Sequence, residues 1–169
     1  MKFIEYQKMA RRTQNTKLTK TDKLYHSLLG MCSEVGEIML AVNVNERLKE
    51  IGDLCWFIAE FCDMMEFDMN SLHRGFYSAL DVTDGEGIEY LASGVGIIHG
   101  IFQKSLQGHY VDETRIKEEL HCLIEQMGRL CKFYGSTLED VMARNIAKLK
   151  KRYPEGFDVE HSVNRGAES

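Results

Sequence analysis

The sequence predicts an all-α protein with a four-helix-bundle core and extra helices at both ends. Apolar residues recur at steps of three and four over most of the chain, which is the period of a helix that buries one face. No stretch of useful length alternates apolar and polar residues as a β-strand does. The chain has one proline, Pro154, so nothing before it forces a long helix to break.

The chain has 169 residues, 44% hydrophobic and 28% charged, which suits one domain over residues 1–158 and a disordered polar tail over 159–169. The formal net charge of −5 argues against a dedicated binder of nucleic acid or of anionic membranes, because both require a basic surface. No apolar stretch reaches the about 18 residues of a membrane span. Residues 1–12 lack the apolar region of a signal peptide. We therefore expect a cytoplasmic protein with no membrane partner.

The first half of the chain predicts three helices. The first covers residues 2–12, and the polar run 13–21 supplies capping residues for the next helix. That helix covers residues 24–42 and ends at a turn over 43–45. A second apolar stripe then continues through 51–65. Because the turn is short, the two helices on either side of it are expected to pack antiparallel as a hairpin.

The rest of the chain predicts four more helices and one glycine-rich loop. Gly135 interrupts the helical pattern before the last helix. Ser136 and Glu139 have the spacing of a capping box at the start of that helix. The expected elements are a short helix from about residue 71, a loop over 84–87, and helices over 89–106, 112–134 and 137–152.

The two halves are weakly similar to each other. Residues 53–72 align with 119–138 in their apolar positions, and a nearly equal shift aligns Gly30 with Gly94. A degenerate duplication of a helix hairpin explains this alignment, but so does the apolar period that all amphipathic helices share. Under these shifts only one candidate acid, Asp53, meets another acid, Glu119.

Four acids form two pairs on the predicted hairpin. Glu34 and Glu37 are three residues apart on its first helix, and Glu50 and Asp53 are three apart on its second, so each pair projects to one side. A solvated helix face explains either pair alone. Together, four carboxylates at matching positions repel each other unless a cation lies between them, and oxygen ligands suit Mg²⁺, with Mn²⁺ as a substitute. A glycine inside each pair costs its helix about 1 kcal/mol relative to alanine, which favours close approach of a helix or ligand.

The last helix carries the opposite charge. Asn145, Lys148 and Arg152 lie at steps of three and four and therefore line one face, from which they can bind phosphate. Favourable interaction with the helix dipole is the alternative role of these cations. Trp56 follows the second acidic pair and is a candidate to stack on a nucleobase, with a plain core position as the equal alternative. His26 is given no catalytic role.

Four separated motifs resemble the MazG-like, all-α nucleoside triphosphate pyrophosphohydrolases of the MazG and dimeric dUTPase superfamily. The closing motif, N-x-x-K-x-x-x-R-Y-P-x-G-F, is the most specific of the four. The motifs are Tyr6-Gln7 with Arg12-Thr13, Gly30-Met-Cys-Ser-Glu34-Val-Gly-Glu37, Glu50-Ile-Gly-Asp53-Leu-Cys-Trp56, and Asn145-Ile-Ala-Lys148-Leu-Lys-Lys-Arg152-Tyr-Pro-Glu-Gly-Phe157.

The resemblance implies an enzyme whose two acidic pairs hold Mg²⁺ and serve catalysis. Such an enzyme cuts a nucleoside triphosphate between the α and β phosphates and gives a nucleoside monophosphate and pyrophosphate. Ser33 stands where many members carry a further acid, so the residue that activates the water stays open, with Glu37 as the candidate. Residues 85–106 resemble the architecture of the dimeric dUTPase-like branch, which leaves the substrate open.

The leading expectation is therefore a Mg²⁺-dependent pyrophosphohydrolase of (d)NTPs that removes non-standard or excess nucleotides. The alternatives are a dUTPase-like or alarmone hydrolase of the same superfamily, a non-catalytic nucleotide- or metal-binding regulator, and a structural bundle with a solvated acidic face. We also expect a homodimer or larger homo-oligomer, because two hairpins of this size leave apolar faces that a partner can cover.

Overall fold

A computed structural model describes residues 1–73, 83–159 and 162, and these residues form seven helices and no strand. The all-α prediction is therefore confirmed. Most of the predicted tail over 159–169 lies outside the described residues. No helix in the described part of the chain is long and apolar enough to cross a membrane. The helices are α1 (Phe3–Arg11), α2 (Lys20–Leu40), α3 (Val44–Met65), α4 (Met69–Leu72), α5 (Asp84–Ser105), α6 (Glu113–Phe133) and α7 (Leu138–Arg152).

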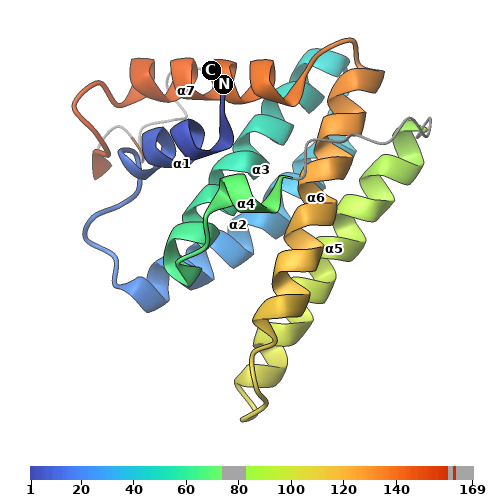
Figure 1. Cartoon of the computed structure of the whole chain (residues 1–169). Helices are drawn as coiled ribbons and strands as arrows, with labels where there is room; N and C mark the ends of the chain where they lie inside the picture. Colours follow the sequence, from blue (N-terminus) through green and yellow to red (C-terminus); the bar gives the residue numbers. More distant parts are fainter. Residues whose placement is uncertain (74–82, 160–161, 163–169) are drawn as a thin grey trace.

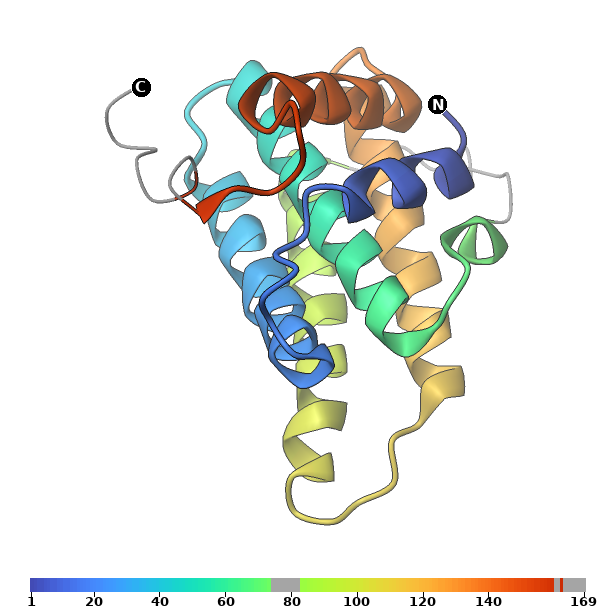
Figure 2. The ribbon, with the colours of Figure 1, turned by 90° about the vertical axis from the view of Figure 1, so that its left-hand side faces the viewer.

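Two helix hairpins form the core of the molecule. The hairpin of α2 and α3 packs against the hairpin of α5 and α6, with α2 on α5 and α3 on α6 (Figure 1). The helices α1 and α7 lie across one end of this bundle and both contact α3 (Figure 2). As a result, α3 is packed against α2, α1 and α7, and it is the helix on which elements from both ends of the chain meet.

The same close contact occurs inside both hairpins. A Cβ atom at Gly30 would lie 2.1 Å from the ring of Phe57, and a Cβ atom at Gly94 would lie 2.9 Å from the side chain of Leu123. In the sequence, Gly30 aligns with Gly94, and Phe57 aligns with Leu123. A large side chain of the second helix therefore occupies the space over a glycine of the first helix in each hairpin, which is what a duplicated hairpin predicts.

The loop predicted over 84–87 is wrong, because this segment is the first turn of α5. Thr83 caps the helix: its hydroxyl accepts a hydrogen bond from the backbone N–H of Glu86, and the Glu86 carboxylate accepts one from the backbone N–H of Thr83. Gly87 serves packing, since a Cβ atom there would lie 2.5 Å from the side chain of Leu130. Glycine here permits close approach of α6 and does not mark a turn.

Side-chain caps also set the starts of α3 and α7. The capping box predicted at Ser136 and Glu139 is wrong by one residue, because the hydroxyl of Thr137 accepts the hydrogen bond from the backbone N–H of Asp140 at 3.1 Å. Asn43 caps α3 directly after the turn that ends α2. The short connection places α2 and α3 side by side, as the hairpin prediction requires.

Candidate functional site

Three of the four predicted acids meet between α2 and α3. Glu34 comes from α2, and Glu50 and Asp53 come from α3; one carboxylate oxygen of each lies within 4.8 Å of the others. Glu50 is buried, and Glu34 and Asp53 are partly buried. We refer to these three residues as the acidic cluster. Their oxygen atoms are close enough together to hold one divalent cation.

The fourth acid, Glu37, lies outside the acidic cluster. Its side chain is exposed, and its carboxylate accepts a hydrogen bond of 3.5 Å from the hydroxyl of Ser33. Its negative charge nevertheless contributes to raising the pKa of Glu34 and of Glu50, so it lies near the rim of the cluster. A role for Glu37 as a metal ligand stays a prediction.

The surroundings of the acidic cluster disfavour the ionised form of two of its carboxyl groups. Burial, followed by the negative charges of Asp53, Glu37 and Glu50, raises the pKa of Glu34 to about 8. Its Oε2 atom is buried and has no hydrogen-bond partner among the described residues. Burial also raises the pKa of Glu50, despite its salt bridge of 2.9 Å to Lys49. A bound cation would reduce the repulsion between the carboxylates and would give the buried Oε2 atom of Glu34 a partner.

Asp53 links the acidic cluster to the basic last helix. Its carboxylate accepts hydrogen bonds from the Lys148 ammonium at 2.6 Å and from the Asn145 amide at 2.7 Å. The hydroxyl of Tyr6, which is fully buried, donates to the Asn145 amide oxygen at 2.9 Å and lies 3.2 Å from the Gly52 carbonyl oxygen. Tyr6 belongs to the first motif of the sequence, but the pattern alone gave it no role. Here it fixes the amide that holds Asp53.

The two glycines inside the acidic pairs differ in their surroundings. A Cβ atom at Gly52 would lie 3.2 Å from the Cβ atom of Asn145, so glycine allows α7 to approach α3 closely. At Gly36 an added Cβ atom would meet nothing within 4 Å. Close helix packing is therefore present at Gly52 and absent at Gly36, where approach of a ligand stays a prediction.

A cavity of about 280 Å³ adjoins the acidic cluster, and both Glu34 and Asp53 line it. Trp56 lines the cavity too, and its indole N–H donates to the Thr13 hydroxyl at 2.8 Å, which fixes the ring. Arg152 lines the same cavity, whereas the hydrogen bonds from α7 to Asp53 come from Asn145 and Lys148. We call this space the ring-lined cavity because Trp56, Phe57, Tyr153, Phe157 and His26 contribute their rings to it.

A buried acid contacts His26, one of the residues that line the ring-lined cavity. Glu60 is fully buried, and its Oε2 atom lies 2.6 Å from Nδ1 of His26. Its other oxygen has no hydrogen-bond partner in the described part of the chain. The pair is separated by 34 positions in the sequence, and the helical period alone did not indicate it. An acid within an apolar run was the available signal, since a buried carboxylate requires a partner.

The second hairpin has an ion pair where the first has its acids. Glu119, which aligns with Asp53, is buried and pairs with Arg115 on the preceding turn of α6. Among the described residues, no second group of three closely spaced metal-ligating side chains is present. In the described part of the chain, the acidic cluster therefore has no counterpart in the second hairpin.

Comparison of the chain with known protein families, with curated proteins and with solved structures finds no match. The resemblance to the MazG-like family therefore stays a prediction from the sequence motifs. The fold and the site define an all-α bundle protein with an acidic cluster, a lysine and an asparagine bound to that cluster, and an adjoining ring-lined cavity.

Proposed function

We propose that the protein is a Mg²⁺-dependent nucleoside triphosphate pyrophosphohydrolase. It would cleave (d)NTPs to a nucleoside monophosphate and pyrophosphate and thereby remove non-standard or excess nucleotides. The proposal rests on three features that meet at Asp53, namely the acidic cluster, the cation Lys148 and the ring-lined cavity. These three features suit a metal-bound nucleotide, because they offer oxygen ligands, a positive charge for phosphate and aromatic surface for a base.

The acidic cluster suits Mg²⁺, or Mn²⁺ as a substitute. Its three residues offer hard oxygen ligands within 4.8 Å of one another, and the buried Oε2 of Glu34 lacks a partner in the described residues. In the proposal Glu34, Glu50 and Asp53 hold the ion, and Glu37 completes the site at the rim. When bound, the ion neutralises phosphate charge and makes a nearby water more acidic.

The proposed reaction is hydrolysis at the α phosphorus. The oxygen of a water molecule bonds to this phosphorus, the bond from the phosphorus to the bridging oxygen breaks, and pyrophosphate leaves with that oxygen. Glu37 is the candidate to accept the water's proton, because its carboxylate is exposed beside the acidic cluster. Lys148 neutralises phosphate charge next to Asp53, and Asn145 keeps the Asp53 carboxylate in place.

The nucleoside would occupy the ring-lined cavity. Trp56 is held by Thr13, so its ring is fixed before a base arrives, and aromatic rings stack on bases with little dependence on base identity. Arg152 adds a positive charge to the same wall, within the reach of a ligand that also contacts Asp53. This arrangement suits a substrate with a flat base and a charged phosphate chain.

A panel of canonical and modified (d)NTPs, including dUTP and an alarmone, tests the proposal through pyrophosphate release with Mg²⁺ and with EDTA. We expect Mg²⁺-dependent release from at least one triphosphate. Nucleotide binding in calorimetry without pyrophosphate from any substrate would contradict the proposal and would indicate a regulator instead.

We also propose that the protein is a homodimer or a larger homo-oligomer. Large apolar side chains are exposed along the outer surface of α2 and just after it, including Leu29 at 69%, Leu40 at 81% and Val42 at 85%. A second copy would remove this apolar surface from water. Light scattering at micromolar concentration should give at least twice the chain mass of 19.4 kDa, and a 19.4 kDa particle alone would contradict the expectation.

A further inference from the structure

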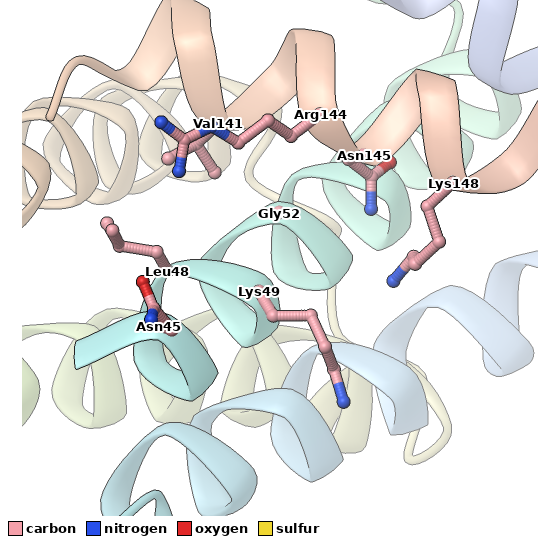
Figure 3. Close-up of a pocket in the computed structure, with 8 residues that line it drawn as sticks. All are labelled: Asn45, Leu48, Lys49, Gly52, Val141, Arg144, Asn145 and Lys148. Atoms are coloured by element: carbon pink, nitrogen blue, oxygen red, sulfur yellow. The ribbon is translucent and has the colours of Figure 1, made fainter. Parts of the chain in front are cut away.

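A second cavity, of about 260 Å³, lies between α3 and α7 (Figure 3). Its walls carry three cations, Lys49 from α3 with Arg144 and Lys148 from α7, and no carboxylate lines it. We call it the cationic cavity. The whole chain has a net charge of −5, so this concentration of positive charge is local. A hollow lined by charges of one sign attracts ligands of the opposite sign, which here means anions.

The cationic cavity lies on the other side of Asp53 from the ring-lined cavity. Asn145 and Lys148 line it, and both donate hydrogen bonds to the Asp53 carboxylate. Along α3, its wall ends at Gly52, and the wall of the ring-lined cavity begins at Asp53. Along α7, its wall ends at Lys148, and that of the ring-lined cavity begins at the next residue. Asp53, held by Asn145 and Lys148, therefore lies where an aromatic compartment and a cationic one adjoin.

We propose that the cationic cavity is the leaving-group subsite, which binds the β and γ phosphates of the substrate and then the pyrophosphate product. This inference rests on the proposed function. If the base lies in the ring-lined cavity and the α phosphate lies at the acidic cluster, the rest of the phosphate chain extends to the far side of Asp53. The cations of the cavity wall face these negative charges, although Lys49 and Lys148 also pair with Glu50 and Asp53. The subsite thus selects triphosphates over nucleoside diphosphates and monophosphates.

Arg144 is the cation of this cavity that is best placed to bind phosphate. Lys49 already pairs with Glu50, and Lys148 pairs with Asp53, whereas Arg144 has no salt bridge among the described residues. Its side chain projects from α7 at the wall of the cavity (Figure 3). A guanidinium group presents paired N–H donors that fit two phosphate oxygens at once. Arg144 lies outside the predicted phosphate-binding set of Asn145, Lys148 and Arg152.

Calorimetric titration of the full chain with inorganic pyrophosphate in Mg²⁺ tests the inference without any turnover. Arg144→Gln should weaken pyrophosphate binding about 10-fold, because one charge-assisted contact is lost. Lys150→Gln is the matched control: it removes one positive charge from an exposed position of the same helix that lines neither cavity. It should leave the affinity within about twofold of the parent. Binding of a nucleoside monophosphate should be unchanged in both variants.

Pyrophosphate affinity that is equal in parent and Arg144→Gln, or reduced equally by Lys150→Gln, would overturn the subsite. No binding to the parent would overturn it as well. These outcomes are distinct from failure of the proposed function. If no triphosphate yields pyrophosphate but Arg144-dependent binding is found, the hydrolase proposal fails and the pyrophosphate site stands. If triphosphates are hydrolysed while Arg144→Gln binds pyrophosphate normally, the hydrolase stands and the subsite is wrong.

Discussion

Replacing Glu34 with glutamine should stabilise the metal-free protein at high pH. The folded protein raises the pKa of this carboxyl from 4.5 to about 8, so between these values the folded state binds more protons than the unfolded state. Stability of the parent should therefore fall as pH rises through this range. The difference between the two pKa values corresponds to about 5 kcal/mol, which we reduce to about 2 kcal/mol because part of the group contacts solvent.

Urea unfolding followed by circular dichroism in EDTA at pH 5, 7 and 9 measures this effect. The unfolding free energy of Glu34→Gln should be close to that of the parent at pH 5 and should exceed it by about 2 kcal/mol at pH 9. Glu89→Gln, at an exposed position of α5, provides the control and should show no such trend. Saturating Mg²⁺ should stabilise the parent and reverse its disadvantage, because the ion binds the ionised carboxylate. A gain that is constant with pH, or that shrinks as pH rises, would refute the electrostatic account of the cluster.

Two further substitutions test the groups around Asp53. Tyr6→Phe removes the hydroxyl that holds Asn145, so the unfolding free energy should fall by about 1 kcal/mol and turnover by about 10-fold. Urea denaturation measures the first effect and steady-state kinetics the second. Unchanged turnover would show that Tyr6 does not position Asp53. Trp56→Ala should raise KM about 10-fold or more through lost stacking of about 1–3 kcal/mol, with a smaller effect on kcat; an unchanged KM would place the base elsewhere.

The helices could be predicted because each buries one face. The apolar residues of α2 and of α3 follow the helical period, and the short turn at Asn43 makes the two helices pack antiparallel. From this, the meeting of Glu34 with Glu50 and Asp53 follows almost directly. Local sequence was less informative at Gly87, because helix propensity does not include the packing of that glycine against a side chain of α6.

Contacts between distant elements were beyond the reach of helical periodicity. The bond from Tyr6 to Asn145 spans 139 positions, and that from Asn145 to Asp53 spans 92. Each depends on how α1 and α7 lie across the bundle, and the periodicity of one helix carries no information about that placement. The position of Glu37 outside the acidic cluster is a related case, since three-residue spacing fixes a face of the helix but not the distance to a neighbouring helix.

The proposed function requires that the acidic cluster of the first hairpin is the site of pyrophosphate release. The most direct test compares Mg²⁺-dependent pyrophosphate yield from the best triphosphate in the parent, in Asp53→Asn and in Glu119→Gln. Asp53 is a member of the cluster, whereas its aligned counterpart Glu119 pairs with Arg115 in the second hairpin. We predict a loss of about 100-fold or more in Asp53→Asn, because a lost ligand disturbs both the ion and the water that it activates. Glu119→Gln should keep at least about half of the parental yield, since Glu119 lies in the second hairpin and is not part of the acidic cluster. An active Asp53→Asn variant beside an inactive Glu119→Gln variant would contradict the account and place the site in the second hairpin.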